Sequence, residues 1–203
     1  MPTLLLIRHG ENDYLKNSRM PGRLPGIHLN ARGLEQAAEL SRTLSVLPII
    51  ALYSSPLERA IETAEPLAQM LGLEIQILPD LTDTDVGEWE GRSWKALGRT
   101  KLWKVVQQTP SQFQFPGGET FGQIQERVIR TLDAITKAHY DELVAVVFHA
   151  DPIKLAVAHY LGLPLDKFQR LTAQTGSVSI LKLDDSSVKV LGLNLTPPFK
   201  LNQ

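Results

Sequence analysis

Two histidines in this chain come directly after runs of aliphatic residues. His9 follows Arg8 at the end of Leu4–Ile7, and His149 follows the run Leu143–Phe148. Near neutral pH an imidazole can act as a nucleophile or a base, and the guanidinium of an adjacent arginine offers a planar fork of donors to an anion. Aliphatic runs of this kind predict strands buried on both faces of a sheet. Each histidine is therefore expected at the carboxyl end of a core strand.

Ligands of open α/β sheets bind beyond the carboxyl ends of the strands. Arg8 and His9 would therefore stand at the mouth of a pocket, with Gly10 allowing a sharp turn and the close approach of a ligand. Arg59 is expected in the first turn of a helix over residues 57–71, where unpaired amides and the helix dipole favour an anion. Taken singly, such charged residues are more often solvated than functional. A functional interpretation requires several motifs that agree.

The remaining chain alternates between predicted strands and predicted helices. Strands are expected over residues 4–7, 49–53, 74–78, 143–148, 177–183 and 188–193, and helices over residues 29–44, 57–71, 93–108, 120–139 and 153–161. This alternation predicts an α/β fold, a three-layer α/β/α sandwich with a mostly parallel central sheet. Asn30 and Thr120 are expected to cap their helices, Pro66 to bend or break one, and residues 184–187 to form a hairpin turn.

Composition limits the classes of partner and site. The 203 residues fit one domain over residues 1–203, with 43% hydrophobic and 21% charged residues. A net charge of −1 lacks the basic field that nucleic acids or anionic membranes attract. There are no cysteines, which excludes disulfides and thiolate metal sites. No signal peptide or membrane-spanning run is evident, so we expect a cytoplasmic protein without nucleic-acid or membrane partners.

Four separated motifs resemble, in the same order, those of the histidine phosphatase superfamily, also called the phosphoglycerate mutase-like family. They are Leu6-Ile7-Arg8-His9-Gly10-Glu11, Ser54-Ser55-Pro56-Leu57 with Arg59, the segment Leu81–Gly91, and Phe148-His149. Weaker similarities are seen at Arg19-Met20-Pro21-Gly22 and at Phe115–Thr120. The resemblance implies a single histidine phosphatase domain with a phosphoglycerate mutase-like fold.

The resemblance also implies roles for individual side chains. His9 would attack phosphorus and become phosphohistidine. Arg8, Arg59 and His149 would bind the phosphoryl oxygens, beside the close-approach glycine of the first motif, and Arg19 would reach the substrate. No metal and no cofactor would be needed, because side chains supply the positive charge.

The proton donor for the leaving group is less sharply assigned. By resemblance Asp83 would protonate the leaving alkoxide and then deprotonate the attacking water. The family more usually has Glu there, and Asp is one methylene shorter, so Asp85 and Glu88 are substitutes. Asp151 is a rival, because one branch of the superfamily uses an Asp just after the second histidine.

Three functions are open at this stage. The first is a phosphomonoester hydrolase, a phosphatase acting on a small phosphorylated metabolite. The second is a cofactor-dependent phosphoglycerate mutase, disfavoured because such mutases usually carry insertions for which this chain is too short. The third is a phosphate-binding protein without activity, suggested by three departures from the family: Asp83 itself, Ala150 in place of Gly, and Leu15 in place of Asn. The substrate is not identified, and a homodimer through an edge strand or a helix is open.

Overall fold

Six strands form one sheet in the order β3-β2-β4-β1-β5-β6. The computed structural model describes residues 2–183 and 187–199. Its strands are β1 (Thr3–Arg8), β2 (Ile49–Ser54), β3 (Ile75–Ile77), β4 (Leu143–Phe148), β5 (Val178–Leu183) and β6 (Val188–Leu195). Strands β3, β2, β4 and β1 are parallel, whereas β5 and β6 are antiparallel additions at one edge. The mostly parallel sheet is confirmed; the expected hairpin turn lies outside the described residues except for Ser187.

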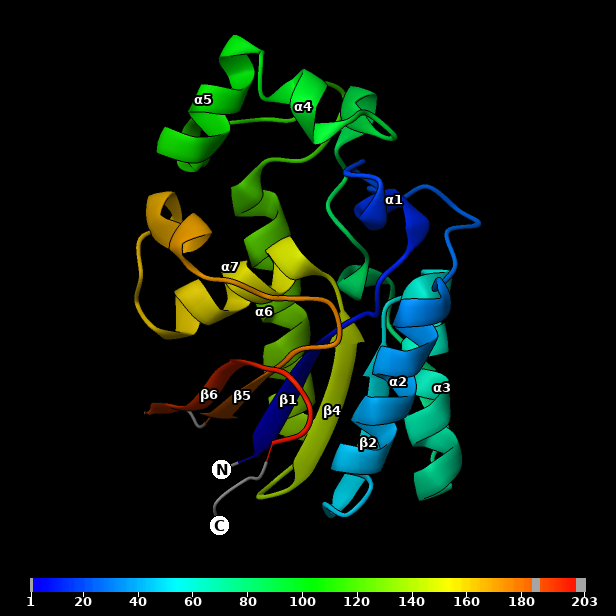
Figure 1. Ribbon diagram of the computed structural model, residues 1–203. Coiled ribbons are helices and arrows are strands. Elements are labelled where there is room, and N and C mark those ends of the chain that lie inside the picture. The colour runs from blue at the N-terminus through cyan, green and yellow to red at the C-terminus, as the bar shows by residue number, and fades with distance from the viewer. Residues whose placement is uncertain (1, 184–186, 200–203) are drawn as a thin grey trace.

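Helices cover both faces of the sheet and one of its ends (Figure 1). They are α1 (Asp13–Lys16), α2 (Ala31–Leu44), α3 (Glu58–Leu71), α4 (Trp94–Leu97), α5 (Lys101–Gln108), α6 (Phe121–Ala138) and α7 (Ala150–Tyr160). Helices α2 and α3 lie on one face and α6 and α7 on the other, which confirms the three-layer sandwich (Figure 1). Helices α1, α4 and α5 lie beyond the carboxyl ends of the parallel strands (Figure 1).

Strand β1 is buried on both faces of the sheet, which is why its sequence is continuously aliphatic and does not alternate with polar residues. Successive side chains of a strand point to opposite faces. Accordingly Leu4 and Leu6 pack in the cluster with α6 and α7, while Leu5 and Ile7 pack in the cluster with α2 and α3. All four are at most 1% exposed. At about 1.5–3 kcal/mol for each fully buried aliphatic side chain, this strand anchors both layers and fixes the position of the residues that follow it.

Local helix signals were largely correct. Asn30 caps α2 by accepting from the Gly33 amide, and Thr120 caps α6 in a reciprocal pair with Gln123. The single helix expected over residues 93–108 is wrong: α4 ends at Leu97, and Thr100 caps a separate α5. No helix of the described ranges combines the length and apolarity that crossing a bilayer requires.

Two prolines lie within helices of the structure. Helix α3 does not end at Pro66, because the residues around it, Ala64 and Leu67, pack in the core and hold the helix together. Helix α7 begins at Ala150, three residues earlier than expected, with Pro152 in its first turn, where the missing amide hydrogen costs little. The second histidine therefore lies directly between the end of a strand and the start of a helix.

Candidate active site

His9 and His149 lie side by side because their strands are parallel neighbours in register. Arg8 of β1 is opposite Phe148 of β4, and the His9 amide donates to the Phe148 carbonyl at 3.0 Å. The two imidazole centroids are 5.1 Å apart. Both rings are almost completely buried, so the fold brings together the two histidines that the strand ends predict.

One nitrogen of the His9 ring is hydrogen-bonded, and the described residues show no hydrogen bond to the other. Its Nδ1 lies 2.7 Å from the Gly10 carbonyl oxygen. Because a carbonyl can only accept, Nδ1 must carry the hydrogen, which leaves the lone pair on Nε2. Burial, followed by the positive charge of Arg59, holds the pKa of His9 well below its usual range. The result is a neutral imidazole with a free Nε2, the form that a nucleophile requires.

His149 is fixed through its other nitrogen. Its Nε2 lies 2.7 Å from the Ser55 hydroxyl, which also accepts from the Leu57 amide at 3.3 Å. The hydroxyl can donate its hydrogen to Nε2, and the Asp83 carboxylate oxygen on the other side of the ring favours the ring hydrogen on Nδ1. Burial and then Arg59 hold the pKa of His149 well below its usual range. His149 thus presents a neutral N–H donor, 3.4 Å from Asp83 Oδ2.

Two arginines, Arg59 buried and Arg8 half-buried, have donors that the described residues leave unused. Arg59 is completely buried in the first turn of α3, where its Nη2 donates to Asp83 Oδ2 and to the Gly22 carbonyl, both at 2.8 Å. Its Nε and Nη1 have no hydrogen-bond partner among the described residues, and neither has Arg8 Nε. Arg8 Nη1 donates to the Ala173 carbonyl at 2.7 Å. Buried donors without partners are costly, and a bound anion would satisfy them.

A small cavity of about 80 Å³ opens beside His9. Its charged lining residues are Arg8, Asp83 and Asp151. Its apolar lining residues include Leu15, Met20, Pro21, Val86 and Trp94. The cavity therefore combines a nucleophile, a cation and carboxylates with an apolar wall.

The structure separates the four candidate proton donors into two pairs. Asp83 and Asp151 line the cavity, whereas Asp85 and Glu88 are not among its lining residues. Asp83 contacts His149 and Arg59 through Oδ2. Asp151 forms an ion pair with Lys154 at 2.7 Å. Asp83 is therefore the candidate nearest to the phosphate-binding donors.

Arg19 and Gly10 make contacts that the sequence did not predict. Arg19 is exposed, donates to the Gly91 carbonyl at 3.0 Å, and is not among the lining residues of the cavity beside His9. At Gly10 a Cβ would come within 2.7 Å of the Gly33 carbonyl oxygen, so this glycine allows the start of α2 to approach β1. Its contribution to the site is the carbonyl that fixes His9.

Sequence reasoning gave no role to several residues that shape the site. Ser55 fixes His149, and Thr63 accepts the Gly10 amide at 2.9 Å. Ser55 directly follows a predicted strand, but only the strand order places β2 next to β4. Arg127 and Glu119 lie far from Asp83 in sequence and contact its segment. Within the described ranges, no group of three or more His, Cys, Asp or Glu side chains is arranged to hold a metal ion.

Comparison with known proteins decides the family. A family model described as the histidine phosphatase superfamily (branch 1) matches residues 4–196. The chain belongs to the histidine phosphatase superfamily.

Relatives of this histidine phosphatase carry phosphatase names. Phosphoserine phosphatase 1 of Hydrogenobacter thermophilus is 29% identical over 198 residues, which is 97% of this chain and 93% of that protein. A metal-independent phosphoserine phosphatase of Arabidopsis thaliana is 32% identical over 156 residues, 74% of this chain and 65% of that protein. The crystal structure of the α-ribazole phosphatase from Shigella flexneri superposes with a TM-score of 0.84 at 26% identity, over 95% of this chain and 96% of that one. Fold and enzyme class, a phosphatase, agree with the motifs.

Proposed function

We propose that this histidine phosphatase hydrolyses the phosphomonoester of a small metabolite, without a metal, through a phosphohistidine on His9. The observation that carries the proposal is the hydrogen bond from His9 Nδ1 to the Gly10 carbonyl, which leaves Nε2 unprotonated. Both the position of His9 in the cavity wall and its lowered pKa support the role of nucleophile.

In the first step His9 Nε2 attacks phosphorus as the bond from phosphorus to the leaving oxygen breaks. Asp83, in its protonated form, gives its hydrogen to that oxygen, so the leaving group departs as an alcohol. The unused donors of Arg8 and Arg59 and the Nδ1–H of His149 would bind the nonbridging oxygens. Donors that are fixed before the reaction stabilise developing charge without reorganisation.

In the second step a water attacks the phosphohistidine. The Asp83 carboxylate takes a proton from that water, the bond from phosphorus to Nε2 breaks, and inorganic phosphate leaves. His9 returns to its neutral form and Asp83 to its protonated form. Two arginines supply the positive charge for which other phosphoryl-transfer enzymes use metal ions, so no cofactor enters the scheme.

Phosphoserine is the first substrate to test. Two relatives carry that activity in their names. A second cavity of about 500 Å³ shares Arg8 and Leu15 with the first and is also lined by Glu11, Arg32 and Glu39. A leaving group with both an amino and a carboxyl group could pair with such a mixture of charges. A cytoplasmic location and a homodimer stay predictions from the sequence.

The test is phosphate release in the presence of EDTA by the wild type and His9→Ala. The panel contains phosphoserine, sugar phosphates, phosphoglycerates and nucleotides, and His159→Ala serves as an exposed-histidine control. Release by the wild type and the control but not by His9→Ala is the expected result. Activity that needs added metal, or that survives in His9→Ala, would contradict the proposal. If both proteins are silent, 3-phosphoglycerate primed with 2,3-bisphosphoglycerate tests the mutase alternative.

A further inference from the structure

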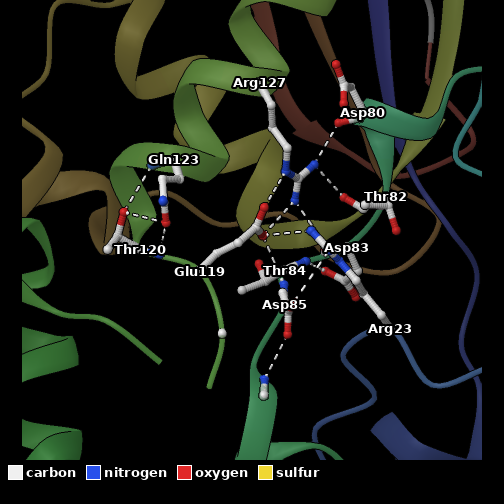
Figure 2. Close-up of polar contacts among 12 residues, drawn as sticks. Arg23, Asp80, Thr82, Asp83, Thr84, Asp85, Glu119, Thr120, Gln123 and Arg127 are labelled. Atoms are coloured by element: carbon white, nitrogen blue, oxygen red, sulfur yellow. Dashed lines mark hydrogen bonds and ion pairs between the residues drawn. The ribbon is translucent and has the colours of Figure 1, made fainter. Parts of the chain in front are cut away.

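Arg127 of α6 reaches the chain segment that ends in Asp83 (Figure 2). Its guanidinium donates to three main-chain carbonyls: Asp80 at 2.6 Å, Thr82 at 2.9 Å and Asp83 at 3.0 Å. The Arg127 side chain is 10% exposed. Because a guanidinium is planar and its donors are fixed relative to one another, these bonds define the path of the segment.

Glu119 holds Arg127 in this orientation. Its carboxylate accepts from Arg127 Nε at 2.9 Å and Nη2 at 3.1 Å, and also from the Asp85 amide at 3.0 Å. The Glu119 amide in turn donates to the Asp85 carbonyl at 3.0 Å. Burial raises the pKa of Glu119, but the bonds from Arg127 and the Asp85 amide outweigh it and leave that pKa below its usual value. Glu119 is therefore ionised and connects Arg127 of α6 to the main chain of Asp85, two residues after Asp83.

Arg23 approaches the same residue from a different part of the chain. Its Nε donates to the Asp83 carbonyl at 2.9 Å, and its Nη2 lies 2.9 Å from Glu119 Oε2. Arg23 belongs to the loop between α1 and α2, whereas Arg127 belongs to α6. Two arginines from distant segments thus converge on one carbonyl, that of Asp83 (Figure 2).

The main chain of Asp83 matters because its carboxylate is carried on a single methylene. A short side chain can move little once its backbone is fixed, so the position of the Asp83 main chain determines the position of Oδ2. Oδ2 lies 2.8 Å from Arg59 Nη2 and 3.4 Å from His149 Nδ1. We infer that Arg23, Glu119 and Arg127 form a positioning cluster that places the Asp83 carboxylate for proton transfer. This inference rests on the proposed function, in which Asp83 is the proton donor. None of the three lines the cavity beside His9, so the cluster acts through Asp83.

A structural anchor and a positioning cluster differ in what they do to different leaving groups. Loss of an anchor lowers activity toward every substrate alike. Loss of proton-donor placement slows an alkyl phosphate, whose leaving oxygen needs a proton, much more than p-nitrophenyl phosphate, whose phenolate leaves without one. Water attack on the phosphohistidine is common to both substrates, whereas kcat/KM reports only on the steps through formation of the phosphohistidine. The ratio of the two kcat/KM values therefore separates the roles.

The experiment measures kcat/KM, which excludes the shared hydrolysis of the phosphohistidine, for phosphoserine, or the alkyl phosphate that the wild type hydrolyses best, and for p-nitrophenyl phosphate. Asp83→Asn should lose about 10²–10⁴-fold with the alkyl ester and far less with the aryl ester. Arg127→Lys and Arg23→Gln should each lose about tenfold with the alkyl ester and about twofold or less with the aryl ester. Arg130→Gln is the matched control: it is an exposed arginine of the same helix, paired with the Asp80 side chain, and should leave both rates unchanged.

A double-mutant cycle supplies the second readout. If Arg127 acts through Asp83, Arg127→Lys should cost about twofold or less once Asp83→Asn is present, because interacting sites are not additive. Should Arg127→Lys fail to fold, as judged by thermal melting, Arg23→Gln carries the same cycle, because Arg23 is 33% exposed.

The outcomes separate the inference from the function on which it rests. Equal losses with both esters, or additive losses in the cycle, would overturn the positioning cluster and leave the proposed chemistry standing. No leaving-group dependence in Asp83→Asn would overturn both the cluster and the assignment of Asp83. Full activity in His9→Ala would overturn the proposed function itself.

Discussion

The ends of strands β1 and β4 carry the same residue in nearly the same setting, yet they present opposite nitrogens. His9 and His149 both follow a buried parallel strand, and burial and Arg59 lower the pKa of each. His9 Nδ1 faces the Gly10 carbonyl, whereas His149 Nε2 faces the Ser55 hydroxyl. One hydrogen-bond partner therefore decides which ring offers a lone pair and which offers a hydrogen.

This comparison shows how a symmetric scaffold produces unequal chemistry. Because both rings are neutral, the positive charge of the site comes from Arg8 and Arg59, whose donors are only partly used by the described residues. The fold supplies two equivalent strand ends, and the residues just after them, together with neighbouring segments, assign the roles. Replacing one histidine, or one group that distinguishes the two, therefore tests how the roles are assigned.

The largest effect is expected from replacing the two histidines separately. His9→Ala should lose about 10⁴-fold or more in kcat, as removal of a nucleophile does. His149→Ala should lose about 10²–10³-fold, as removal of one fixed donor does. Rapid quenching should trap an acid-labile phosphoryl group on His149→Ala but not on His9→Ala. A phosphoenzyme in His9→Ala would reverse the assignment of the two rings.

The next largest effect is expected from replacing the carboxylate that donates the proton to the leaving group. Asp83 contacts His149 and Arg59, whereas Asp151 is neutralised by Lys154. Asp83→Asn should lose about 10²–10⁴-fold in kcat with an alkyl phosphate, and Asp151→Asn about threefold or less. The measurement is steady-state hydrolysis of phosphoserine and p-nitrophenyl phosphate by both variants. The opposite ranking with phosphoserine would move the proton donor to Asp151.

The fold was predictable where local signals decide it. The aliphatic runs at β1 and β4 and the cap at Asn30 depend only on neighbouring residues, and the structure confirms them. The break between α4 and α5 was not predictable, because apolar residues such as Trp94, Leu97 and Val105 keep a helical spacing across it. Thr100 caps the first turn of α5, so a new helix begins there despite the continuous helical spacing of the apolar residues.

The site was predictable only in part for a related reason. Residues that follow strands, such as His9 and His149, can be found from the sequence because sheets place their ligands there. The role of Ser55 depends on β2 lying beside β4, and that of Arg127 on a contact across 44 residues of sequence. Such partners become visible only when the strand order and the packing of α6 are known.

A smaller effect should follow from removing the group that distinguishes His149 from His9. Ser55→Ala deletes the hydroxyl at His149 Nε2 and lets the ring exchange its tautomers. We expect kcat to fall about tenfold, since an imidazole with the wrong tautomer cannot donate from Nδ1. Imidazole ¹⁵N shifts should show protonation at Nδ1 in the wild type and a mixture in the variant. Ser54→Ala removes an equally buried hydroxyl whose one hydrogen bond within the described residues goes to the Ser55 carbonyl, and it should keep both activity and shifts.

The smallest effect is expected on the pH dependence of stability, because the pKa values of both buried histidines are lowered. Their pKa values are lowered from 6.5, so below pH 6.5 the unfolded chain binds protons that the folded chain does not. Stability is therefore complete above this pH and is lost as the pH falls, by up to about 1.4 kcal/mol per pH unit for each ring. The pKa of exposed His28 is raised by its bond to Glu62, which acts in the opposite direction, so His28→Gln is the background for the measurement.

Urea unfolding between pH 7.5 and 5.5 should show a free energy that falls with pH, and His149→Gln in that background should remove about half of the slope that the two rings contribute. His9→Gln should do the same, because the two rings share burial and the influence of Arg59 even though their chemistry differs. A slope that disappears with one substitution and survives the other would mean that only one ring stays neutral in the folded protein. In that case the two strand ends would differ in charge as well as in tautomer.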